Sequence, residues 1–359
     1  MYMPVHLYSE KNAVVKHYEK IIRYGTNALI VTGKSSAKKS GALDDVIGIF
    51  ENNNIRYTIF DNVEENPSVK TVLTASRVGK TEGVDLVIGI GGGSPLDAAK
   101  AIAFLLAHPD GSAELLYTKG YDDSLPLILI PTTCGTGSEV TAVSVLTIPE
   151  KHTKKSISHR IFADLALIDC KYLRTASVEI LRNTALDALT HMIESYINSG
   201  SDDFSRMFVD AGLKLWKKNM YVLEDGKATD EQLLEMMNTA AIGGMAIAQD
   251  GTGIPHGLSY SLTYKLHVPH GKAVGYFTAG YLNAASEIDR NYILNSLGFA
   301  DINDFQKWYI RLFGKTEVDV RILNESVEEL WNNKPKINTA PFEITKTTLE
   351  EIAFYTMKY

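Results

Sequence analysis

Cysteine is scarce in this chain, with only 2 among 359 residues. Cys134 and Cys170 are too few for the disulfide framework that is typical of small secreted proteins. Long apolar runs are also missing, since no stretch approaches the roughly 20 residues that a membrane-spanning helix requires. The N-terminus lacks the basic and then apolar pattern of a signal peptide. These absences predict a cytoplasmic protein.

Basic residues are also fewer than acidic residues. The chain has 36 Lys and Arg residues against 43 Asp and Glu residues, and its formal net charge is −7. Binding to nucleic acid depends on an excess of basic groups that neutralise phosphates. We therefore expect neither nucleic acid nor a membrane as a partner, and we expect small molecules or further copies of the same chain.

Short apolar runs rich in β-branched residues alternate with helical patterns up to about residue 175. These runs cover residues 28–33, 57–61, 85–91 and 125–133. The alternation predicts a parallel sheet with helices on its faces. A last short strand candidate covers residues 166–170.

Strand signals almost vanish beyond this point, and helical periods take over. They cover residues 187–197, 208–220, 231–248 and 271–288. We predict two domains, an α/β domain over residues 1–175 and an all-α domain over residues 176–359.

Three consecutive glycines, Gly91–Gly93, separate a predicted strand from a strongly helical run. Glycines let a ligand approach the backbone, and the free N–H groups of a helix start bind phosphate. Ser94 as N-cap, Pro95 at the first helical position and Asp97 beyond it would also suit an ordinary helix start. An ordinary start does not need three glycines, so phosphate binding is favoured. The G-x-G-x-x-G fingerprint is absent and adds no support.

A second polar run, residues 132–139, follows the next predicted strand. Ligands of α/β sheets bind at the carboxyl ends of strands, where hydroxyl groups and glycines can contact ribose and diphosphate oxygens. An ordinary solvated loop explains this run equally well.

Asp187 and His191 lie four residues apart in a predicted helix, so both side chains lie on one face. His256 and His270 each stand in a Pro-His-Gly setting and could complete a metal site. Three imidazoles and one carboxylate without a thiolate suit Fe²⁺, Zn²⁺ or a similar ion. The alternative is a solvated helix face and two unrelated loop histidines.

The segments GGGSPLDAAKAIA, PTTCGTGSEVT and DALTHMIESY, with the two Pro-His-Gly segments, resemble the iron-containing (group III) alcohol dehydrogenase family. The resemblance covers essentially the whole chain in the right order. It is closest to the shorter bacterial members of the 1,3-propanediol and butanol dehydrogenase kind. It implies a Rossmann-like dinucleotide-binding domain and a helical domain, together the dehydroquinate synthase-like fold. The implied activity is hydride transfer between NAD(P) and a small primary alcohol, diol or aldehyde, in a homodimer or larger homo-oligomer.

The resemblance also implies roles for single residues. The ligands of an Fe²⁺ (or Zn²⁺) ion, which act in catalysis through the metal, would be Asp187, His191, His256 and His270. Contacts to the dinucleotide would come from Gly91, Gly92, Gly93, Ser94, Asp97, Thr132, Thr133, Ser138, Asn66 and Lys154.

Two positions depart from the family pattern. Many members carry a further histidine four residues after the third ligand, where it is thought to help in proton transfer, and this chain has Tyr260 there. With an ordinary pKa near 10, a tyrosine is a poorer proton relay at neutral pH. His267 is a substitute relay or equally a surface loop histidine.

The second departure concerns the choice of cofactor. NAD-selective relatives place an acidic residue just after the first strand, where it repels a 2′-phosphate, and this chain has Gly33 there. A basic and hydroxyl-rich run follows, made of Lys34, Ser35, Ser36, Lys38 and Lys39. Such a run can accept a 2′-phosphate, although lysines often merely cover a surface loop. We expect NADP(H) to be favoured over NAD(H).

Related activities on the same scaffold remain as alternatives. A glycerol dehydrogenase-like polyol oxidoreductase would use the same ligands. Maleylacetate reductase would need no metal. A dehydroquinate synthase-like lyase would need a basic pocket, for which residues 251–275 offer only Lys265 and Lys272 beside the histidines. A non-catalytic nucleotide-binding relative is a further alternative, with Tyr260 as the sign of lost turnover.

Overall fold

The computed structural model describes residues 2–108, 111–151 and 153–359. They form two compact units, one of residues 2–176 with 229–241 and one of residues 177–228 with 242–359. The helix α10 (Asp230–Asp250) contributes residues to both units. The expected domain boundary after residue 175 stays a prediction.

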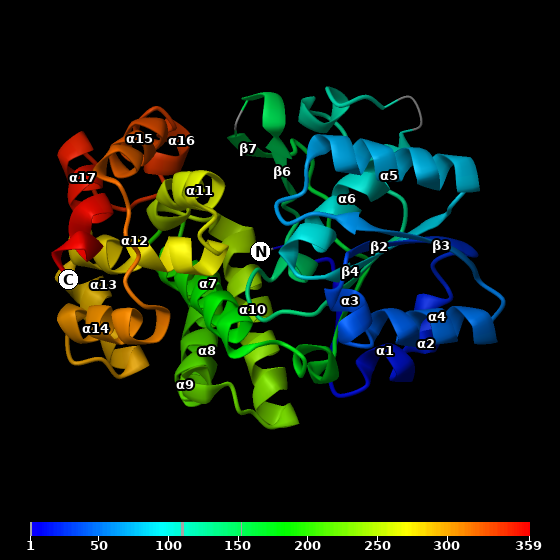
Figure 1. Cartoon of the computed structure of the whole chain (residues 1–359), viewed down its shortest axis with the longest axis horizontal. Coiled ribbons are helices and arrows are strands. Elements are labelled where there is room, and N and C mark those ends of the chain that lie inside the picture. Colours follow the sequence, from blue (N-terminus) through cyan, green and yellow to red (C-terminus); the bar gives the residue numbers. More distant parts are fainter. Residues whose placement is uncertain (1, 109–110, 152) are drawn as a thin grey trace. The chain divides into compact units, whose positions relative to one another are not determined.

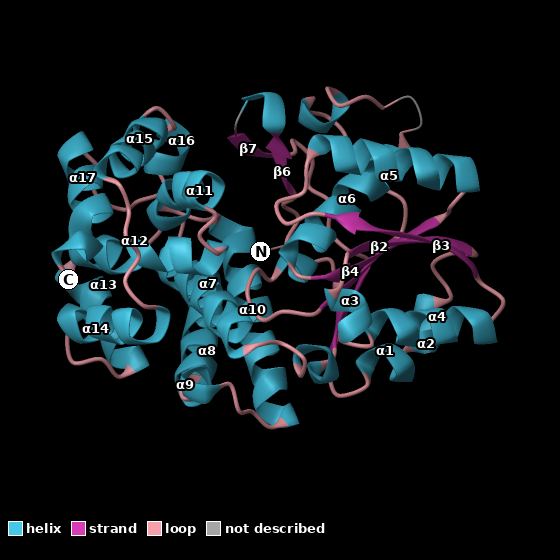
Figure 2. Ribbon diagram, viewed as in Figure 1, coloured by secondary structure: helices cyan, strands magenta, loops and turns pink. Residues whose placement is uncertain are grey.

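The first unit contains a parallel sheet of six strands, as Figures 1 and 2 show in part. This confirms the predicted α/β class. In spatial order the strands are β1 (His6–Ser9), β8 (Leu165–Ile168), β5 (Leu127–Pro131), β4 (Leu86–Gly91), β2 (Asn27–Gly33) and β3 (Arg56–Val63).

Helices cover both faces of this sheet (Figure 1). Alternate residues of a strand point to opposite faces. In β4, Ile88 and Ile90 join the core beneath α1 (Ala13–Lys16), α2 (Tyr18–Ile21), α3 (Ser36–Lys39) and α4 (Ala42–Asn52). Val87 joins the core beneath α5 (Val69–Glu82) and α6 (Gly93–Ala107). Because both faces are buried, the strands are apolar at consecutive positions.

Three strands of this unit are not predicted by the sequence pattern. β1 is only four residues long, and β6 (Val145–Ile148) pairs antiparallel with β7 (Thr153–Ser156). The β7 sequence, TKKS, is polar and mostly exposed, so it has no apolar pattern to detect. Short 3₁₀ segments complete the unit: η1 (Leu115–Tyr117), η2 (Ser138–Val140), η3 (Pro149–Lys151) and η4 (Cys170–Leu173).

The second unit is helical, and the described residues within it form no strand (Figure 2). This confirms the predicted all-α class. Its elements besides the shared α10 are α7 (Val178–Tyr196), α8 (Asp203–Asn219), α9 (Val222–Asp225), α11 (Ile254–Leu266), α12 (His270–Ala284), α13 (Glu287–Leu297), α14 (Ile302–Phe313), α15 (Val320–Trp331), α16 (Lys334–Ile337), α17 (Lys346–Phe354) and η5 (Tyr355–Lys358).

Glycines allow α12 to lie directly against α7. A Cβ atom on Gly271 would lie 1.7 Å from the carbonyl oxygen of Asn183, and one on Gly275 would lie 2.2 Å from Cδ2 of Leu186. A side chain at either position would clash, so the two helices approach as closely as their backbones permit. α12 also packs on α11, and these three helices carry the residues of the candidate site.

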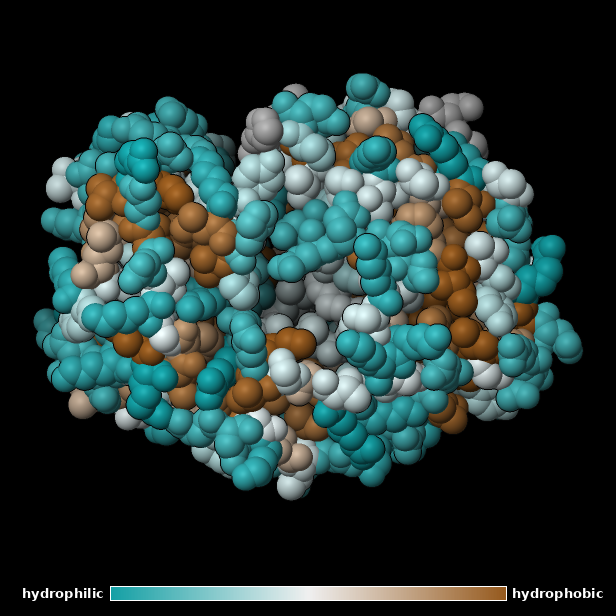
Figure 3. All heavy atoms as spheres, in the orientation of Figure 1, coloured by the Kyte–Doolittle hydropathy of each residue, from teal (hydrophilic) through white to brown (hydrophobic). Residues whose placement is uncertain are grey.

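Polar residues cover most of the face shown in Figure 3, and apolar residues gather in separate groups. Among the described residues, no helix combines the length and the apolar character needed to cross a bilayer.

Candidate active site

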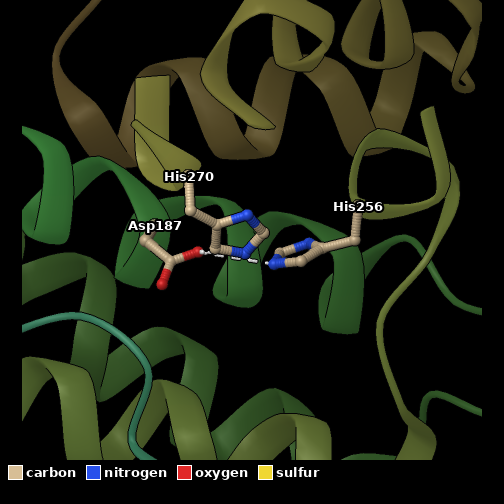
Figure 4. Close-up of side chains that lie close together, drawn as sticks. All are labelled: Asp187, His256 and His270. Carbon is tan, nitrogen blue, oxygen red and sulfur yellow. Dashed lines mark ion pairs between the residues drawn. The ribbon is translucent and has the colours of Figure 1, made fainter. Parts of the chain in front are cut away.

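Asp187, His256 and His270 come from three helices of the second unit and meet at one place (Figure 4). Asp187 lies in the middle of α7, His256 in the first turn of α11, and His270 is the first residue of α12. One ligand atom from each of the three lies within 4.8 Å of the others. His191 follows Asp187 by one turn of α7, and its ring stacks on His256 with 4.6 Å between the centroids.

The Nε2 atoms of all three histidines surround a single carboxylate oxygen. Oδ1 of Asp187 lies 3.4 Å from Nε2 of His256, 3.7 Å from Nε2 of His270 and 3.8 Å from Nε2 of His191. The structure therefore brings together all four residues that the sequence proposes as metal ligands.

The surroundings of these side chains suit a cation. Asp187 is 2% exposed and His256 is 4% exposed. Oδ1 of Asp187 and Nε2 of His256 are buried and make no hydrogen bond to any described residue. Buried polar atoms without such a bond are costly. A divalent ion among one carboxylate and three imidazoles would satisfy them, so the residues present fit the expected metal.

The charges at this place act on one another. Burial alone would raise the pKa of Asp187, but the charges of His191, His270 and His256 together outweigh it and hold the pKa well below its ordinary range. Burial alone would lower the pKa of His256, but the charges of Glu194 and Asp187 and the hydrogen bond to Glu194 together outweigh it and raise the pKa to about 9. In the absence of an ion, the carboxylates therefore favour a protonated His256.

Glu194 is a site residue that the sequence analysis misses. It is completely buried, and it accepts hydrogen bonds from both the backbone N–H and the ring of His256. Glu194 lies seven residues after Asp187 on α7, on the same helix stripe. That spacing was available in the sequence, but nothing in the sequence alone places His256 beside it.

The two residues considered for proton transfer, Tyr260 and His267, differ in how far they are buried. Burial raises the pKa of Tyr260 to about 12, with a further contribution from the charge of Glu194. His267 is exposed and forms the C-cap of α11 in a left-handed conformation, with a φ of 53°.

In the first unit, the glycine turn after β4 leads into α6. Gly91 has a φ of 151°, and α6 begins at Gly93 with Gly92 as N-cap. No side chain caps this end, so its N–H groups are available to an anion such as a diphosphate. The glycines have a packing reason too, because a Cβ on Gly93 would lie 2.6 Å from Cγ2 of Thr136.

The alternative explanation of this segment, in which Ser94 caps α6 and Pro95 takes the first helical position, does not hold. The glycine turn lets the helix begin earlier, so both residues lie inside its first turn. The Ser94 hydroxyl instead accepts a hydrogen bond from the backbone N–H of Asn66, at 3.0 Å.

Asn66, Ser94 and Lys154 lie together, although they are distant in the sequence. Asn66 adopts a left-handed conformation, with a φ of 59°, and its side-chain oxygen accepts a hydrogen bond from Nζ of Lys154 at 2.7 Å. Burial lowers the pKa of Lys154 to about 8. The family resemblance implies that all three residues contact the dinucleotide, and the fold brings them to one place.

Asp97 and Ser138 belong to a network that is centred on Lys100. Nζ of this fully buried lysine donates to Oγ of Ser138 at 2.7 Å and to the carbonyl oxygen of Val143 at 2.8 Å. Ser138 in turn donates to Oδ1 of Asp97 at 2.6 Å, and Oδ2 accepts from the N–H of Val145. Lys100 is not among the residues predicted from the sequence, although it lies one helical turn after Asp97.

The loop after β5 lies against the glycine turn. The N–H of Thr132 donates to the carbonyl oxygen of Gly91 at 2.8 Å, and a Cβ on Gly92 would lie 3.2 Å from Cγ2 of Thr133. The hydroxyl of Thr132 is buried and makes no hydrogen bond to any described residue. It is therefore a candidate contact for a ligand at this edge of the sheet.

The run that follows β2 is exposed at the same edge. Gly33 ends β2, and the exposed side chains of this run are Lys34, Ser35, Ser36, Lys38 and Lys39. A Cβ on Gly33 would lie 3.4 Å from the carbonyl oxygen of Val63, so a side chain there is tolerable with a small adjustment.

Two models of known protein families match this chain. Residues 4–170 match the model of the iron-containing alcohol dehydrogenases, and residues 182–340 match the model of the C-terminal part of that family. The chain belongs to the iron-containing alcohol dehydrogenase family. This confirms the resemblance. The family implies a bound Fe²⁺ ion and a nicotinamide dinucleotide, NAD(P).

Individual members of the family are similar to the chain over different lengths. The NADPH-dependent butanol dehydrogenase of Clostridium saccharobutylicum is 30% identical over 69% of this chain and 65% of its own length. The 1-propanol dehydrogenase of Salmonella typhimurium is 30% identical over 69% of this chain and 66% of its own length. Each match thus spans slightly less than two thirds of the relative. The iron-containing alcohol dehydrogenase of Thermotoga maritima matches 100% of this chain and 99% of its own, with 34% identity and a TM-score of 0.92.

Proposed function

We propose that this protein transfers hydride between NADP(H) and a small primary alcohol or diol, or the corresponding aldehyde, with a divalent metal ion as cofactor. The observation that carries the proposal is the group of three histidine Nε2 atoms around one buried carboxylate oxygen. A glycerol dehydrogenase-like activity on polyols uses the same ligands and is the alternative within this class.

Asp187, His191, His256 and His270 would hold the ion. A bound Fe²⁺ or Zn²⁺ supplies a Lewis acid that lowers the pKa of an alcohol or polarises an aldehyde carbonyl. The four ligands supply one negative charge against the two of the ion, so the ion and its ligands together keep a positive charge for a developing oxyanion.

Solvent can reach the site on the side where His270 lies. Its side chain is 32% exposed, whereas Asp187 and His256 are almost completely buried. A substrate would therefore approach beside His270. The buried residues on the other sides exclude water and fix the ligands in place.

Tyr260 would act as a hydrogen-bond donor rather than as a proton carrier. Its pKa of about 12 keeps the phenol protonated at neutral pH. It can thus donate a hydrogen bond, but it does not release a proton under ordinary conditions. This reading leaves proton exchange to water.

The edge of the sheet at β2, β4 and β5 would bind the dinucleotide. The uncapped start of α6 would receive the diphosphate, and the buried hydroxyl of Thr132 offers an additional contact. Asn66 and Lys154 would add a positive group beside Ser94.

The preference for NADP(H) rests on the run after β2. Gly33 replaces the acid that would repel a 2′-phosphate, and the lysines and serines that follow are exposed. The similarity to a relative that is named NADPH-dependent adds support.

The lyase alternative gains no support from Lys265, one of the two lysines that residues 251–275 offer for a basic pocket. Lys265 is bonded to Glu325 at 2.8 Å and to Glu329 at 3.2 Å, so its charge is already neutralised. The non-catalytic alternative is weakened because all four proposed ligands converge. The cytoplasmic location and the homodimer or larger homo-oligomer stay predictions.

The test is the oxidation of NADPH and of NADH with a short aldehyde, using protein purified anaerobically. Turnover is measured before chelation, after chelation, and after Fe²⁺ or Zn²⁺ is added back. We expect turnover that favours NADPH, disappears with the chelator and returns with a metal. Binding of the dinucleotide without turnover under any metal would contradict the proposal and favour the lyase or the non-catalytic alternative.

A further inference from the structure

Glu194 is a fully buried carboxylate beside the proposed metal ligands, and it has no assigned part in the reaction. It lies on α7, three residues after His191 and seven after Asp187, so one stripe of this helix carries all three side chains. A carboxylate without exposure to solvent needs strong partners to remain in place.

Both oxygens of Glu194 contact the same residue. Oε1 accepts a hydrogen bond from the backbone N–H of His256 at 2.8 Å, and Oε2 lies 2.5 Å from Nδ1 of the His256 ring. An ionised carboxylate only accepts hydrogen bonds, so Nδ1 must carry the proton. The other ring nitrogen, Nε2, is the one that lies 3.4 Å from Oδ1 of Asp187.

We propose that Glu194 is a positioning residue that fixes the orientation and the tautomer of His256, so that the Nε2 lone pair faces the metal. The inference rests on the proposed function, because it gives His256 the part of a ligand. A hydrogen bond from the second ring nitrogen to a carboxylate orients a ligating histidine and increases its basicity. The backbone contact adds a second restraint, since it fixes the main chain from which the ring projects.

A purely structural part for Glu194 is the competing explanation. His256 lies in the first turn of α11, and the N-cap of that helix, Gly253, has no side chain to cap it. In this explanation, the only role of Glu194 is to replace the missing cap by accepting a hydrogen bond from one N–H group of α11. The two explanations differ in their consequence for the metal, because a cap alone would leave metal affinity unchanged.

Glu194→Gln separates the two explanations. A glutamine has nearly the same shape, but it has one acceptor oxygen and one NH₂ group in place of two acceptors. Its oxygen can accept a hydrogen bond from the backbone N–H or from the Nδ1–H of His256, but not from both. If the oxygen caps α11, the NH₂ group faces Nδ1 and favours the tautomer that has a proton on Nε2.

The matched control is Glu329→Gln. Glu329 lies on α15 and also bonds α11, through Ser261 at 2.8 Å, but it does not touch a proposed ligand. The dissociation constant for Zn²⁺ is measured by competition with a chromophoric chelator for the wild-type protein and for both variants. We expect Glu194→Gln to raise this constant by about 10- to 100-fold. The control should stay within about twofold of the wild type.

An unchanged Zn²⁺ constant in folded Glu194→Gln would overturn the inference and leave Glu194 as a cap. If the wild-type protein binds no divalent metal, the proposed function fails and the inference fails with it. Normal wild-type binding with an unaffected variant refutes the inference alone.

A second measurement needs no Glu194 variant and covers the case in which Glu194→Gln does not fold. In the Zn²⁺-loaded wild-type protein, ¹⁵N NMR of labelled histidines reports which ring nitrogen carries the proton. We expect the His256 signal, assigned by its loss in His256→Asn, to show a protonated Nδ1. A proton on Nε2 with Nδ1 bare would overturn the inference.

Discussion

Replacement of Gly271 by alanine is expected to damage the metal site without touching a ligand. Gly271 follows His270 at the start of α12. A Cβ atom there would lie 1.7 Å from the carbonyl oxygen of Asn183 and 2.7 Å from its carbonyl carbon. These are backbone atoms of α7, so they have no rotamer that would move them away. Gly271→Ala must therefore push the start of α12 away from α7.

The size of this displacement follows from the contact distance. Carbon and oxygen atoms in proteins approach to about 3.3 Å, so the clash requires a movement of about 1.5 Å. Asp187 lies one helical turn after Asn183, and Nε2 of His270 is 3.7 Å from Oδ1 of Asp187. A movement of this size would separate the two ligands. A misplacement of about 1 Å costs roughly 100-fold in rate, and overpacking costs about 1–3 kcal/mol in stability.

Gly257→Ala is the matched control, since Gly257 follows the other Pro-His segment. A Cβ on Gly257 would lie 2.7 Å from Cδ1 of Leu330, the far end of a side chain that can move. The assays are the Zn²⁺ dissociation constant, kcat/KM for a short aldehyde, and the melting temperature. We expect Gly271→Ala to lose about 100-fold or more in kcat/KM and to bind Zn²⁺ more weakly, whereas Gly257→Ala stays within a few fold. Equal behaviour of the two variants would refute the reasoning.

Three further predictions concern a ligand, the cofactor and the stability. His256→Ala should lose metal retention and activity together, and full activity in that variant would remove the proposed site. Gly33→Asp should reduce the use of NADPH relative to NADH, because the new carboxylate repels a 2′-phosphate, and an unchanged ratio of kcat/KM values would show that this residue does not read the phosphate. Burial raises the pKa of Asp250 to about 7. An unfolded Asp loses its proton near pH 4, so Asp250 lowers the free energy of unfolding progressively from about pH 4 to pH 7. Asp250→Asn should therefore raise this free energy at pH 8 by about 2 kcal/mol, with the partial exposure of the side chain allowed for, and should have little effect near pH 4. Urea unfolding at both pH values checks this, and an equal effect at both would contradict the assigned cause.

The parallel sheet is readable from the sequence because its strands are covered on both faces. In β4 and β5 apolar residues occupy consecutive positions, as in LVIGIG and LILIP. The antiparallel pair of β6 and β7 is not readable, since TKKS has no apolar residue to bury. β6 is also linked to a segment distant in the sequence, through the bridge between Ser68 and Thr147.

The alternative in which Ser94 caps α6 also fails because of a contact with a distant segment. A serine before a proline and a helical run is a good N-cap by local criteria. The hydroxyl is instead used by the N–H of Asn66, which lies 28 residues earlier in the chain. The local pattern cannot show that an outside donor competes for the hydroxyl.

The candidate metal site also has one part that the sequence predicts and another part that only the fold shows. The i, i+4 pair of Asp187 and His191 is predictable, because the helix alone sets their spacing. The part of Glu194 is not, since a glutamate on a helix usually faces solvent and only the fold brings His256 to it. The two Pro-His-Gly segments look equivalent in the sequence, yet one glycine faces the end of a leucine side chain and the other faces the backbone of α7. Gly271, the glycine after His270, therefore sets the distance between α12 and Asp187. A substitution at this position should weaken metal binding.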